Sequence, residues 1–408
     1  MRVIILGADG YIGFPLSLRL ARRGHFLLLV DNFTTRRIVR SLDSRSVVPV
    51  HGMPARLVTM REYFPSPIKF IVGDVTRLPL VERWVKEFQP ECIVHLAQQP
   101  RAPYSMIGPE EAWTTIANNV RGNLNVVYAI KRHAPHCHLL KMGSAGEYGT
   151  PNFAIEEGFM AIKYKGRSDT IPVPRAGQSF YHLSKIFDSY VVTLANKIWN
   201  VTATDVMQGI VYGLYTQEQK IAPELSTRMD VDAIWGTVLH RQCAELVALG
   251  HILIYGSGKM TRGFLSLEDS ITCLELLMTN PPPERQYRVV NQLDEVLSTL
   301  DIADRVEEAG SNLGLQVQQR EYIPDPRVEA QRHYYNPATA TLKALGFTPA
   351  KTMKDELGYL LQALMHYRHR IPVELLRPTV RWRRTRNLTL GGKHYGTARE
   401  PDTARSQS

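Results

Sequence analysis

The chain has 408 residues, of which 44% are apolar and 22% are charged, so it can bury a sizeable core and is not an intrinsically disordered protein. Its net charge of +10 is unevenly spread, because residues 377–408 carry eight Lys or Arg against two Asp or Glu. We therefore expect a solvated basic tail and no nucleic-acid partner. No apolar run approaches the roughly 18 residues that cross a bilayer, which predicts no integral membrane segment.

Short apolar runs alternate with helix-like segments from residue 1 to about residue 215. The predicted strands are Val3–Leu6, Phe26–Val30, Lys69–Val72, Cys92–Leu96, His138–Met142 and Ala203–Gln208. The predicted helices between them are Tyr11–Arg23, Leu80–Glu87, Asn119–Arg132 and Tyr181–Trp199. This alternation is typical of an α/β protein with a Rossmann-type, doubly wound parallel sheet, and an insert at 34–67 interrupts it.

The rhythm changes after residue 215, where shorter elements and more prolines follow. We therefore expect three parts. Residues 1–215 should form the domain built on the parallel sheet, residues 216–382 mainly a smaller C-terminal substrate-binding domain, and residues 383–408 a basic tail without apolar periodicity.

The cysteines and the clustered histidines predict no metal site. Four cysteines lie far apart and form no Cys-x-x-Cys pair, which argues against a disulfide scaffold or zinc ribbon and for a reducing, cytoplasmic compartment: Cys92, Cys137, Cys243 and Cys273. His133, His136 and His138 are neighbours in sequence, but they lie at a predicted helix end and strand start, where solvent-facing side chains are expected.

A glycine loop, Gly7-Ala8-Asp9-Gly10-Tyr11-Ile12-Gly13, joins the first predicted strand to the first predicted helix. Such glycines allow a tight turn and a close approach of the backbone to a pyrophosphate, while the helix N-terminus offers free N–H groups and partial positive charge. The loop therefore predicts a dinucleotide site.

The second predicted strand is followed by Asp31, 18 residues after Gly13. A carboxylate there can accept hydrogen bonds from both ribose hydroxyls and repels a 2′-phosphate, which favours NAD over NADP. Arg36 and Arg37 leave an alternative open, because they could accept a 2′-phosphate or simply contact the adenine or its phosphates.

Further cofactor contacts are expected at the ends of the third and fourth predicted strands, where such folds bind ligands. The full set expected around the cofactor is Gly7, Asp9, Gly10, Tyr11, Ile12, Gly13, Asp31, Asn32, Arg36, Arg37, Asp74, Val75, Leu96, Ala97, Asn119, Tyr181 and Lys185.

Tyr181 and Lys185 form a Tyr-x-x-x-Lys pair, and residues i and i+4 share one face of a helix. The lysine ammonium is expected to lower the pKa of Tyr181, so that the tyrosine can accept a hydroxyl proton while hydride leaves the same carbon. Ser144, after the fifth predicted strand, is the expected third member and would hydrogen-bond the reacting oxygen. His182, which adjoins Tyr181, is a further catalytic candidate, as a proton donor or as a substrate contact.

This ordered set resembles the extended short-chain dehydrogenase/reductase family, the NAD-dependent epimerases and dehydratases that act on nucleotide-sugars. Within it, residues 1 to about 385 resemble the family of UDP-sulfoquinovose synthases. The distinctive blocks are Ala102-Pro103-Tyr104-Ser105-Met106, Gly146-Glu147-Tyr148-Gly149-Thr150-Pro151, Ser179-Phe180-Tyr181-His182-Leu183-Ser184-Lys185, Gln208-Gly209-Ile210-Val211-Tyr212-Gly213, Thr261-Arg262-Gly263-Phe264, Pro326-Arg327-Val328-Glu329-Ala330 and His333-Tyr334-Tyr335-Asn336.

The resemblance implies that UDP-glucose is oxidised at carbon 4 by NAD⁺, loses water across carbons 5 and 6, gains sulfite at carbon 6, and is reduced again at carbon 4. It also implies a homodimer formed through paired helices, and it leaves room for a partner enzyme that delivers sulfite. The substrate-binding residues it implies are Arg101, Ser144, Tyr181, Gln208, Arg262 and Arg327, the last two because arginine suits a diphosphate.

Two departures from that family's pattern stand near the catalytic serine. Ala145 replaces a methionine, which predicts a roomier pocket near carbon 6, and Gln98-Gln99-Pro100-Arg101 replaces a Glu-Gln-Arg stretch. An ordinary 4,6-dehydratase is disfavoured, because Ala145 and Gly146 stand where such enzymes place Asp-Glu. A 4-epimerase and a catalytically idle NAD-binding scaffold remain alternatives, although Ser144, Tyr181 and Lys185 argue against the scaffold.

Overall fold

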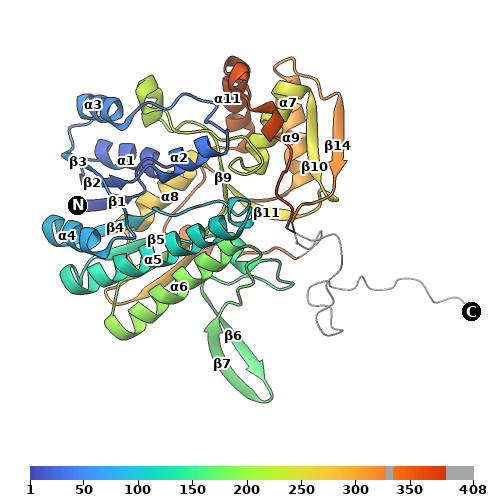
Figure 1. Ribbon diagram of the computed structural model, residues 1–408. Helices are drawn as coiled ribbons and strands as arrows, with labels where there is room; N and C mark the ends of the chain where they lie inside the picture. Colours follow the sequence, from blue (N-terminus) through green and yellow to red (C-terminus); the bar gives the residue numbers. More distant parts are fainter. Residues whose placement is uncertain (328–333, 383–408) are drawn as a thin grey trace, which may run out of the picture.

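A seven-stranded, wholly parallel sheet forms the centre of the molecule in the computed structural model, which describes residues 1–327 and 334–382 (Figure 1). Its strand order is β12-β8-β5-β4-β1-β2-β3. The strands are β1 (Arg2–Leu6), β2 (Phe26–Asp31), β3 (Ile68–Val72), β4 (Cys92–His95), β5 (His138–Met142), β8 (Ala203–Gln208) and β12 (Tyr287–Gln292). The order reverses between β1 and β4, which confirms the predicted doubly wound, Rossmann-type architecture.

Helices cover both faces of this sheet, because a parallel strand must bury both sets of its alternating side chains. Val3 and Ile5 of β1 join the core on one face, whereas Ile4 and Leu6 join the core on the other. The first face packs against α1 (Gly13–Arg22), α3 (Met53–Tyr63) and α8 (Leu267–Thr279). The second packs against α4 (Leu78–Phe88), α5 (Pro109–His133) and α6 (Phe180–Trp199).

The insert at 34–67 contains two helices, α2 (Thr34–Ser41) and α3. Met53, Leu57 and Met60 of α3 are buried against the same core as α1. The insert is therefore part of the helical layer over the sheet, although its sequence pattern did not show this.

The chain beyond residue 215 builds a second core but also returns to the central sheet. Strand β12, which the sequence did not predict, pairs with β8 over the full length of both. The second core lies among α7 (Val238–Leu249), α9 (Thr299–Ser311), α11 (Met353–His366), and the paired strands β10 (His251–Tyr255) and β14 (Gln319–Ile323). The remaining elements there are β9 (Ile210–Tyr212), β11 (Thr261–Ser266), β13 (Glu295–Ser298) and α10 (Ala340–Ala344). The division at residue 215 stays a prediction.

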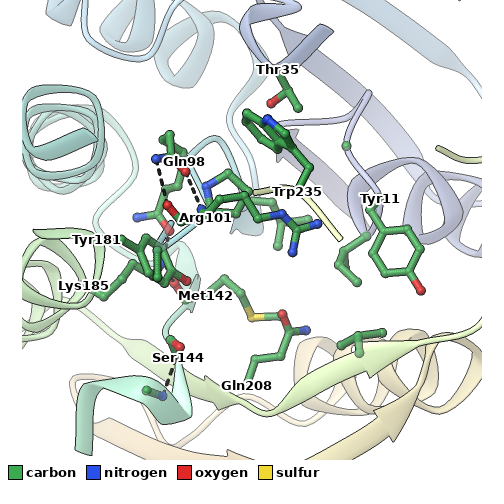
Figure 2. Close-up of a pocket in the computed structure, with 18 of the residues that line it drawn as sticks. Tyr11, Thr35, Gln98, Arg101, Met142, Ser144, Tyr181, Lys185, Gln208 and Trp235 are labelled. Carbon is green, nitrogen blue, oxygen red and sulfur yellow. Dashed lines mark hydrogen bonds between the residues drawn. The ribbon is translucent and has the colours of Figure 1, made fainter. Parts of the chain in front are cut away.

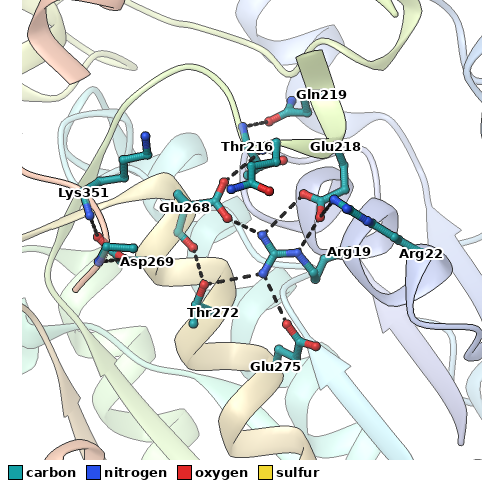
Figure 3. Close-up of polar contacts among 12 residues, drawn as sticks. Arg19, Arg22, Thr216, Glu218, Gln219, Glu268, Asp269, Thr272, Glu275 and Lys351 are labelled. Atoms are coloured by element: carbon teal, nitrogen blue, oxygen red, sulfur yellow. Dashed lines mark hydrogen bonds and ion pairs between the residues drawn. The ribbon is translucent and has the colours of Figure 1, made fainter. Parts of the chain in front are cut away.

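A buried ion cluster joins α1 to the chain beyond residue 215 (Figure 3). The guanidinium of Arg19 on α1 lies 2.6 Å from a carboxylate oxygen of Glu218, also pairs with Glu268, and lies 3.2 Å from Glu275. The side chains of Arg19, Glu218 and Glu268 are at most 9% exposed. Since buried charges are tolerated only when paired, this cluster fixes α8 and the 3₁₀ turn Glu218–Ile221 against the first helix.

A hairpin of β6 (Phe159–Tyr164) and β7 (Arg167–Pro172) projects from the body of the molecule beyond α6 (Figure 1). Across residues 1–327 and 334–382, none of the helices combines the length and the apolar character needed to span a bilayer.

Candidate active site

A cavity of about 390 Å³ opens at the carboxyl ends of the central strands. Its walls come from residues that follow or end β1, β2, β4, β5 and β8, and from the segment 228–240. This is the crevice in which doubly wound sheets bind their ligands. Its volume falls within the usual range of small-molecule sites.

The glycine loop lines this cavity and shows why it needs glycine. Gly7 has a φ of +88°, and a Cβ atom there would lie 2.7 Å from the carbonyl carbon of Leu96. A Cβ atom at Gly13 would lie only 2.1 Å from the carbonyl oxygen of Gly7. The backbone is therefore packed as tightly as a dinucleotide loop requires, with the first turn of α1 directed at the cavity.

Asp31 and Asp9 stand side by side next to this loop, and each is held differently. Asp31 accepts hydrogen bonds from the backbone N–H groups of Asp9, at 2.9 Å, and of Phe33, at 2.7 Å. Burial, together with the charge of Asp9, raises the pKa of Asp31. Asp9 forms a bidentate ion pair with Arg36, with distances of 2.6 and 2.7 Å.

Arg56 on α3 is a second partner of Asp9 that sequence reasoning missed. Its guanidinium donates to Asp9 at 2.6 Å and to the carbonyl of Ser226 at 3.0 Å, and it lies 3.2 Å from the ring centroid of Phe14. Burial lowers the pKa of Arg56 to about 9. The sequence did not indicate this role for Arg56, because its helix has little apolar pattern and its partners lie 47 and 170 residues away in the chain.

Most of the residues expected around a cofactor line the cavity. Those that do are Gly7, Asp9, Gly10, Tyr11, Ile12, Gly13, Asp31, Asn32, Val75, Leu96, Ala97, Tyr181 and Lys185. Arg36, Arg37, Asp74 and Asn119 are outside this lining.

These four have structural contacts instead. Arg36 pairs with Asp9, and Arg37 donates to the carbonyl of Asn32 at 2.6 Å. Asp74 accepts from the backbone of Thr76, while the buried Asn119 bridges Gln99 and Ser184.

Ser144, Tyr181 and Lys185 share one wall of the cavity, opposite Tyr11 (Figure 2). Ser144 follows β5 and caps the 3₁₀ turn Ala145–Tyr148, with its hydroxyl accepting from the backbone of Gly146 at 3.1 Å. The side chain of Ser144 lies close enough to the Tyr181 phenol to lower its pKa. The predicted catalytic set therefore converges on one place.

The expected lowering of the pKa of Tyr181 by Lys185 is not what this arrangement gives. Burial raises the pKa of Tyr181 to about 12, and the side chain of Ser144 offsets only part of that. The Lys185 ammonium instead donates to the side-chain oxygen of Gln98 and to the carbonyl of Met142. Burial, followed by the charge of Lys141, lowers the pKa of Lys185 to about 8.

His182 and Arg101 also line the cavity beside Tyr181. The Nδ1 atom of His182 lies 3.0 Å from the hydroxyl of Ser179, and its ring packs so closely on Gly146 that a Cβ there would lie 2.3 Å from Nε2. Arg101 is half-buried, and this burial lowers its pKa, while the charge of Asp230 counteracts the effect.

The expected diphosphate residues, Gln208, Arg262 and Arg327, also line the cavity. Gln208 donates to Ser270 at 3.2 Å and to Gln292 at 3.1 Å, so its amide is held at the end of β8. The guanidinium of Arg327 lies 5.9 Å from the ring centroid of Trp382, which also lines the cavity.

The segment 228–240 contributes several lining residues that sequence reasoning missed. Arg228 and Asp230 form a buried bidentate pair at 2.7 and 2.8 Å, and Trp235 is almost fully buried. His240 accepts from the backbone of Gly213 at 3.2 Å, and burial lowers its pKa to about 4. The alternating acidic and apolar residues of this segment gave no periodic signal from which to place it.

The clustered histidines point to different partners. His133 lies 3.8 Å from Glu82, and His136 lies 2.5 Å from Glu284 on the exposed surface. His138 is buried, 3.0 Å from the hydroxyl of Thr204. Among the described residues, no three His, Cys, Asp or Glu side chains gather as metal ligands would.

Comparison with protein families matches residues 3–291 to the NAD dependent epimerase/dehydratase family. The chain is 41% identical to the UDP-sulfoquinovose synthase of Sulfolobus acidocaldarius, over 94% of this chain and 98% of that protein. It is 40% identical to the chloroplastic UDP-sulfoquinovose synthase of Spinacia oleracea, over 94% of this chain and 79% of that protein.

Solved structures share the fold at much lower sequence identity. A UDP-glucose 4-epimerase from Thermotoga maritima, solved with UDP-glucose, superposes with a TM-score of 0.66 at 15% identity, over 90% of this chain and 99% of that one. The UDP-glucose 4-epimerase of Bifidobacterium longum, solved with NAD⁺ and UDP, gives 0.66 at 18% identity with the same coverage.

Proposed function

The chain belongs to the NAD-dependent epimerase/dehydratase family and, within it, to the family of the UDP-sulfoquinovose synthases, and we propose that it converts UDP-glucose and sulfite to UDP-sulfoquinovose. The observation that carries this proposal is the roughly 40% identity over 94% of the chain, including the cavity in which Ser144, Tyr181 and Lys185 meet.

NAD is the cofactor of this family, and its hydride chemistry at carbon 4 of the sugar is what makes the later steps possible. The backbone cradle at Gly7 and Gly13 fits its pyrophosphate, since any side chain there would collide with the loop. Asp31 would accept from the adenosine ribose hydroxyls. Arg36 forms an ion pair with Asp9. A guanidinium that is already paired binds a 2′-phosphate poorly, and this supports NAD over NADP.

Tyr181 would hold and move the proton of the sugar 4-hydroxyl, and Ser144 would fix the position of that oxygen. With a pKa near 12, Tyr181 stays protonated at neutral pH and cannot accept that proton until a cation approaches it. We infer that the Lys185 ammonium turns from Gln98 and the Met142 carbonyl toward the ligands and the phenol when substrate binds. The nearby charge then lowers the pKa of Tyr181 into the working range.

The steps at carbons 5 and 6 need a group that moves protons and a cation that receives sulfite. A 4-ketone acidifies the carbon 5 proton, a base removes it, and the carbon 6 hydroxyl leaves as water, which yields a carbon 5–carbon 6 double bond. Sulfite then bonds to carbon 6 through sulfur while carbon 5 regains a proton. We propose His182 as the group that carries these protons, and Arg101 as the cation that receives the sulfite anion. Gln208, Arg262 and Arg327, which line the same cavity, would hold the UDP diphosphate.

We propose a homodimer formed through α5 and α6. These helices pack on each other and leave large apolar side chains exposed: Trp113, Leu124, Phe187, Leu194 and Ile198. An apolar face of this size is typical of an interface, and two-fold pairing is the commonest way to cover it. Phe187→Glu, with the hairpin variant Tyr164→Glu as a control of similar exposure, should shift the mass measured by light scattering from dimer to monomer.

The setting of the reaction is also part of the proposal. Four free, buried cysteines support a reducing, cytoplasmic compartment. We also propose that a partner enzyme releases sulfite close to the cavity and so supplies this site.

Incubation of the protein with UDP-glucose, NAD⁺ and sulfite, followed by mass spectrometry of the sugar nucleotide, tests the proposed function. A sulfonated product that requires sulfite supports it. UDP-galactose formed without sulfite would instead identify a 4-epimerase. Recovery of unchanged UDP-glucose alone would contradict both.

A further inference from the structure

Six ionisable side chains form a buried cluster directly behind the catalytic wall. Three are cations and three are carboxylates, and none of the six side chains is more than a few per cent exposed: Lys141, Arg175, Lys185, Glu147, Asp188 and Asp205. Apart from Lys185, none is among the residues to which the proposed function gives a chemical role. A cluster this costly to bury calls for an explanation beyond packing.

Lys141 is the centre of the cluster. It lies in the middle of the apolar strand β5 and is fully buried. Its ammonium donates to Asp205 on β8 at 3.0 Å and to Ser189 on α6 at 2.8 Å, and it lies 3.8 Å from Glu147. It also lies 3.5 Å from the backbone carbonyl of Lys185.

The carboxylates tie this centre to both catalytic elements. Glu147 accepts from the backbone N–H of Ser144 at 3.0 Å, and from Arg175 at 2.6 Å and Ser189 at 3.0 Å through its other oxygen. Asp188 accepts from the amide of Gln98 at 2.5 Å, and the oxygen of that same amide accepts from Lys185. Lys141 is therefore joined to Lys185 directly, through the backbone carbonyl, and to Ser144 through Glu147.

We propose that Lys141 is a positioning residue: it holds the Ser144 turn and the Lys185 turn of α6 together through Glu147 and Ser189, and it places a second positive charge behind Lys185. This inference rests on the proposed function, in which Lys185 acts as an ammonium. Burial and the charge of Lys141 both disfavour that ammonium and lower the pKa of Lys185 to about 8.

The groups that face Lys141 define its electrostatic setting. Asp205 comes from β8, Glu147 from the 3₁₀ turn, and Asp188 and Lys185 from α6. Arg175 faces it from the chain before α6, the Tyr287 hydroxyl donates to Asp205 from β12, and His95 pairs with Lys141 across β4 and β5. Burial lowers the pKa of His95 to about 3, so His95 is neutral here and the charges that set Lys185 are those of the cluster.

The test compares variants of the full-length protein that change this charge with opposite signs. Lys141→Met removes the cation behind Lys185, and the alkaline limb of the pH–rate profile for UDP-glucose oxidation should move up by about one pH unit. Asp205→Asn removes a carboxylate that favours the Lys185 ammonium, so the alkaline limb of the profile should move to lower pH. The double variant, which keeps the charge balance, should restore the limb.

A second readout reports Lys185 directly. The rate of acetylation of its amine by acetic anhydride, followed across pH by peptide mass spectrometry, should show the same opposite shifts. Ser189→Ala is the matched control, because it removes two hydrogen bonds of the cluster and no charge. It should lower the melting temperature and leave both pH profiles in place.

An unshifted limb in Lys141→Met, or shifts of the same sign in both variants, would overturn the positioning role while the proposed function stood. If Lys141→Met does not fold, the sign of the shift in Asp205→Asn decides alone. If the unaltered protein does not oxidise UDP-glucose at any pH, the proposed function fails, and the role of Lys141 fails with it.

Discussion

Replacement of Arg19 by methionine should destabilise the protein strongly and in a pH-dependent way. Methionine keeps most of the buried aliphatic part of the arginine side chain. It leaves Glu218 and Glu268, which are almost fully buried, without their main cation. Removing one partner from a buried ion pair costs about 3–5 kcal/mol. With an unfolding entropy of about 2.1 cal/mol/K per residue, this loss lowers the melting temperature by roughly 4–6 °C in a chain of this length.

The pH dependence follows from Glu218. Burial raises the pKa of Glu218, whereas the hydrogen bond and the charge of Arg19 lower it. The second effect is larger, so the pKa of Glu218 lies below its ordinary value. A depressed carboxyl pKa stabilises the fold above the ordinary value near 4.5, and this stabilisation is lost as the pH falls through the folded-state pKa. Without Arg19, the strongest influences that lower this pKa are gone, although Thr216 and the half-exposed Arg22 remain. We therefore expect burial to dominate and to raise the pKa of Glu218, so that the variant regains stability as the pH falls from 8 toward 5.

Differential scanning calorimetry of both proteins between pH 5 and 8 checks this. The gap in melting temperature should be widest at pH 8 and should narrow toward pH 5. Arg22→Met is the matched control: its side chain is 52% exposed and lies 3.4 Å from Glu218, so it should cost no more than about 1 kcal/mol. A gap that stays constant with pH, or an equal loss in the control, would refute the reasoning.

Three further predictions concern the reaction. Tyr181→Phe should reduce turnover by about 10²–10⁴-fold with UDP-glucose binding largely kept, as steady-state rates and calorimetry would show; near-full activity would be incompatible with the proposed base. Asp31→Ala should narrow the preference for NAD⁺ over NADP⁺ in titrations of cofactor-stripped protein, and tighter NADP⁺ binding by the unaltered protein would show that Arg37 or Arg36 dominates instead. Ala145, 8% exposed in the cavity wall, should leave room near carbon 6, so Ala145→Met should speed sulfite addition relative to deuterium exchange at carbon 5; slower addition would mean that the pocket is already filled.

The sequence predicts local structure well where one stretch of chain carries the whole signal. The six predicted strands lie within one or two residues of the observed ones, because each is a short apolar run between turn residues. The glycine loop and the Tyr181–Lys185 spacing are equally local, which is why the cavity wall could be anticipated.

The missed features depend on contacts between distant parts of the chain. Strand β12 holds only two central apolar residues, Val289 and Val290, and becomes part of the sheet because β8 offers it an open edge. Lys141 interrupts an apolar strand and would ordinarily be placed at the surface, since lysine is almost never fully buried unless it is paired. Its partners Glu147, Ser189 and Asp205 come from three other elements, and no pattern within one element reveals such a cluster.

The place of β12 has a consequence for how the protein is made. On the ribosome, β8 is complete once residue 208 has been added, but its free edge stays bare until residue 292 follows. At a synthesis rate of about 5–20 residues per second, that edge is open for about 4–17 s. An unpaired strand edge can pair with a strand of another chain, and chaperones prevent this by binding the nascent protein. Nascent chains arrested before residue 287 should therefore be the ones that aggregate or stay bound to chaperones, and those arrested far enough beyond residue 292 for β12 to have left the ribosome should be released.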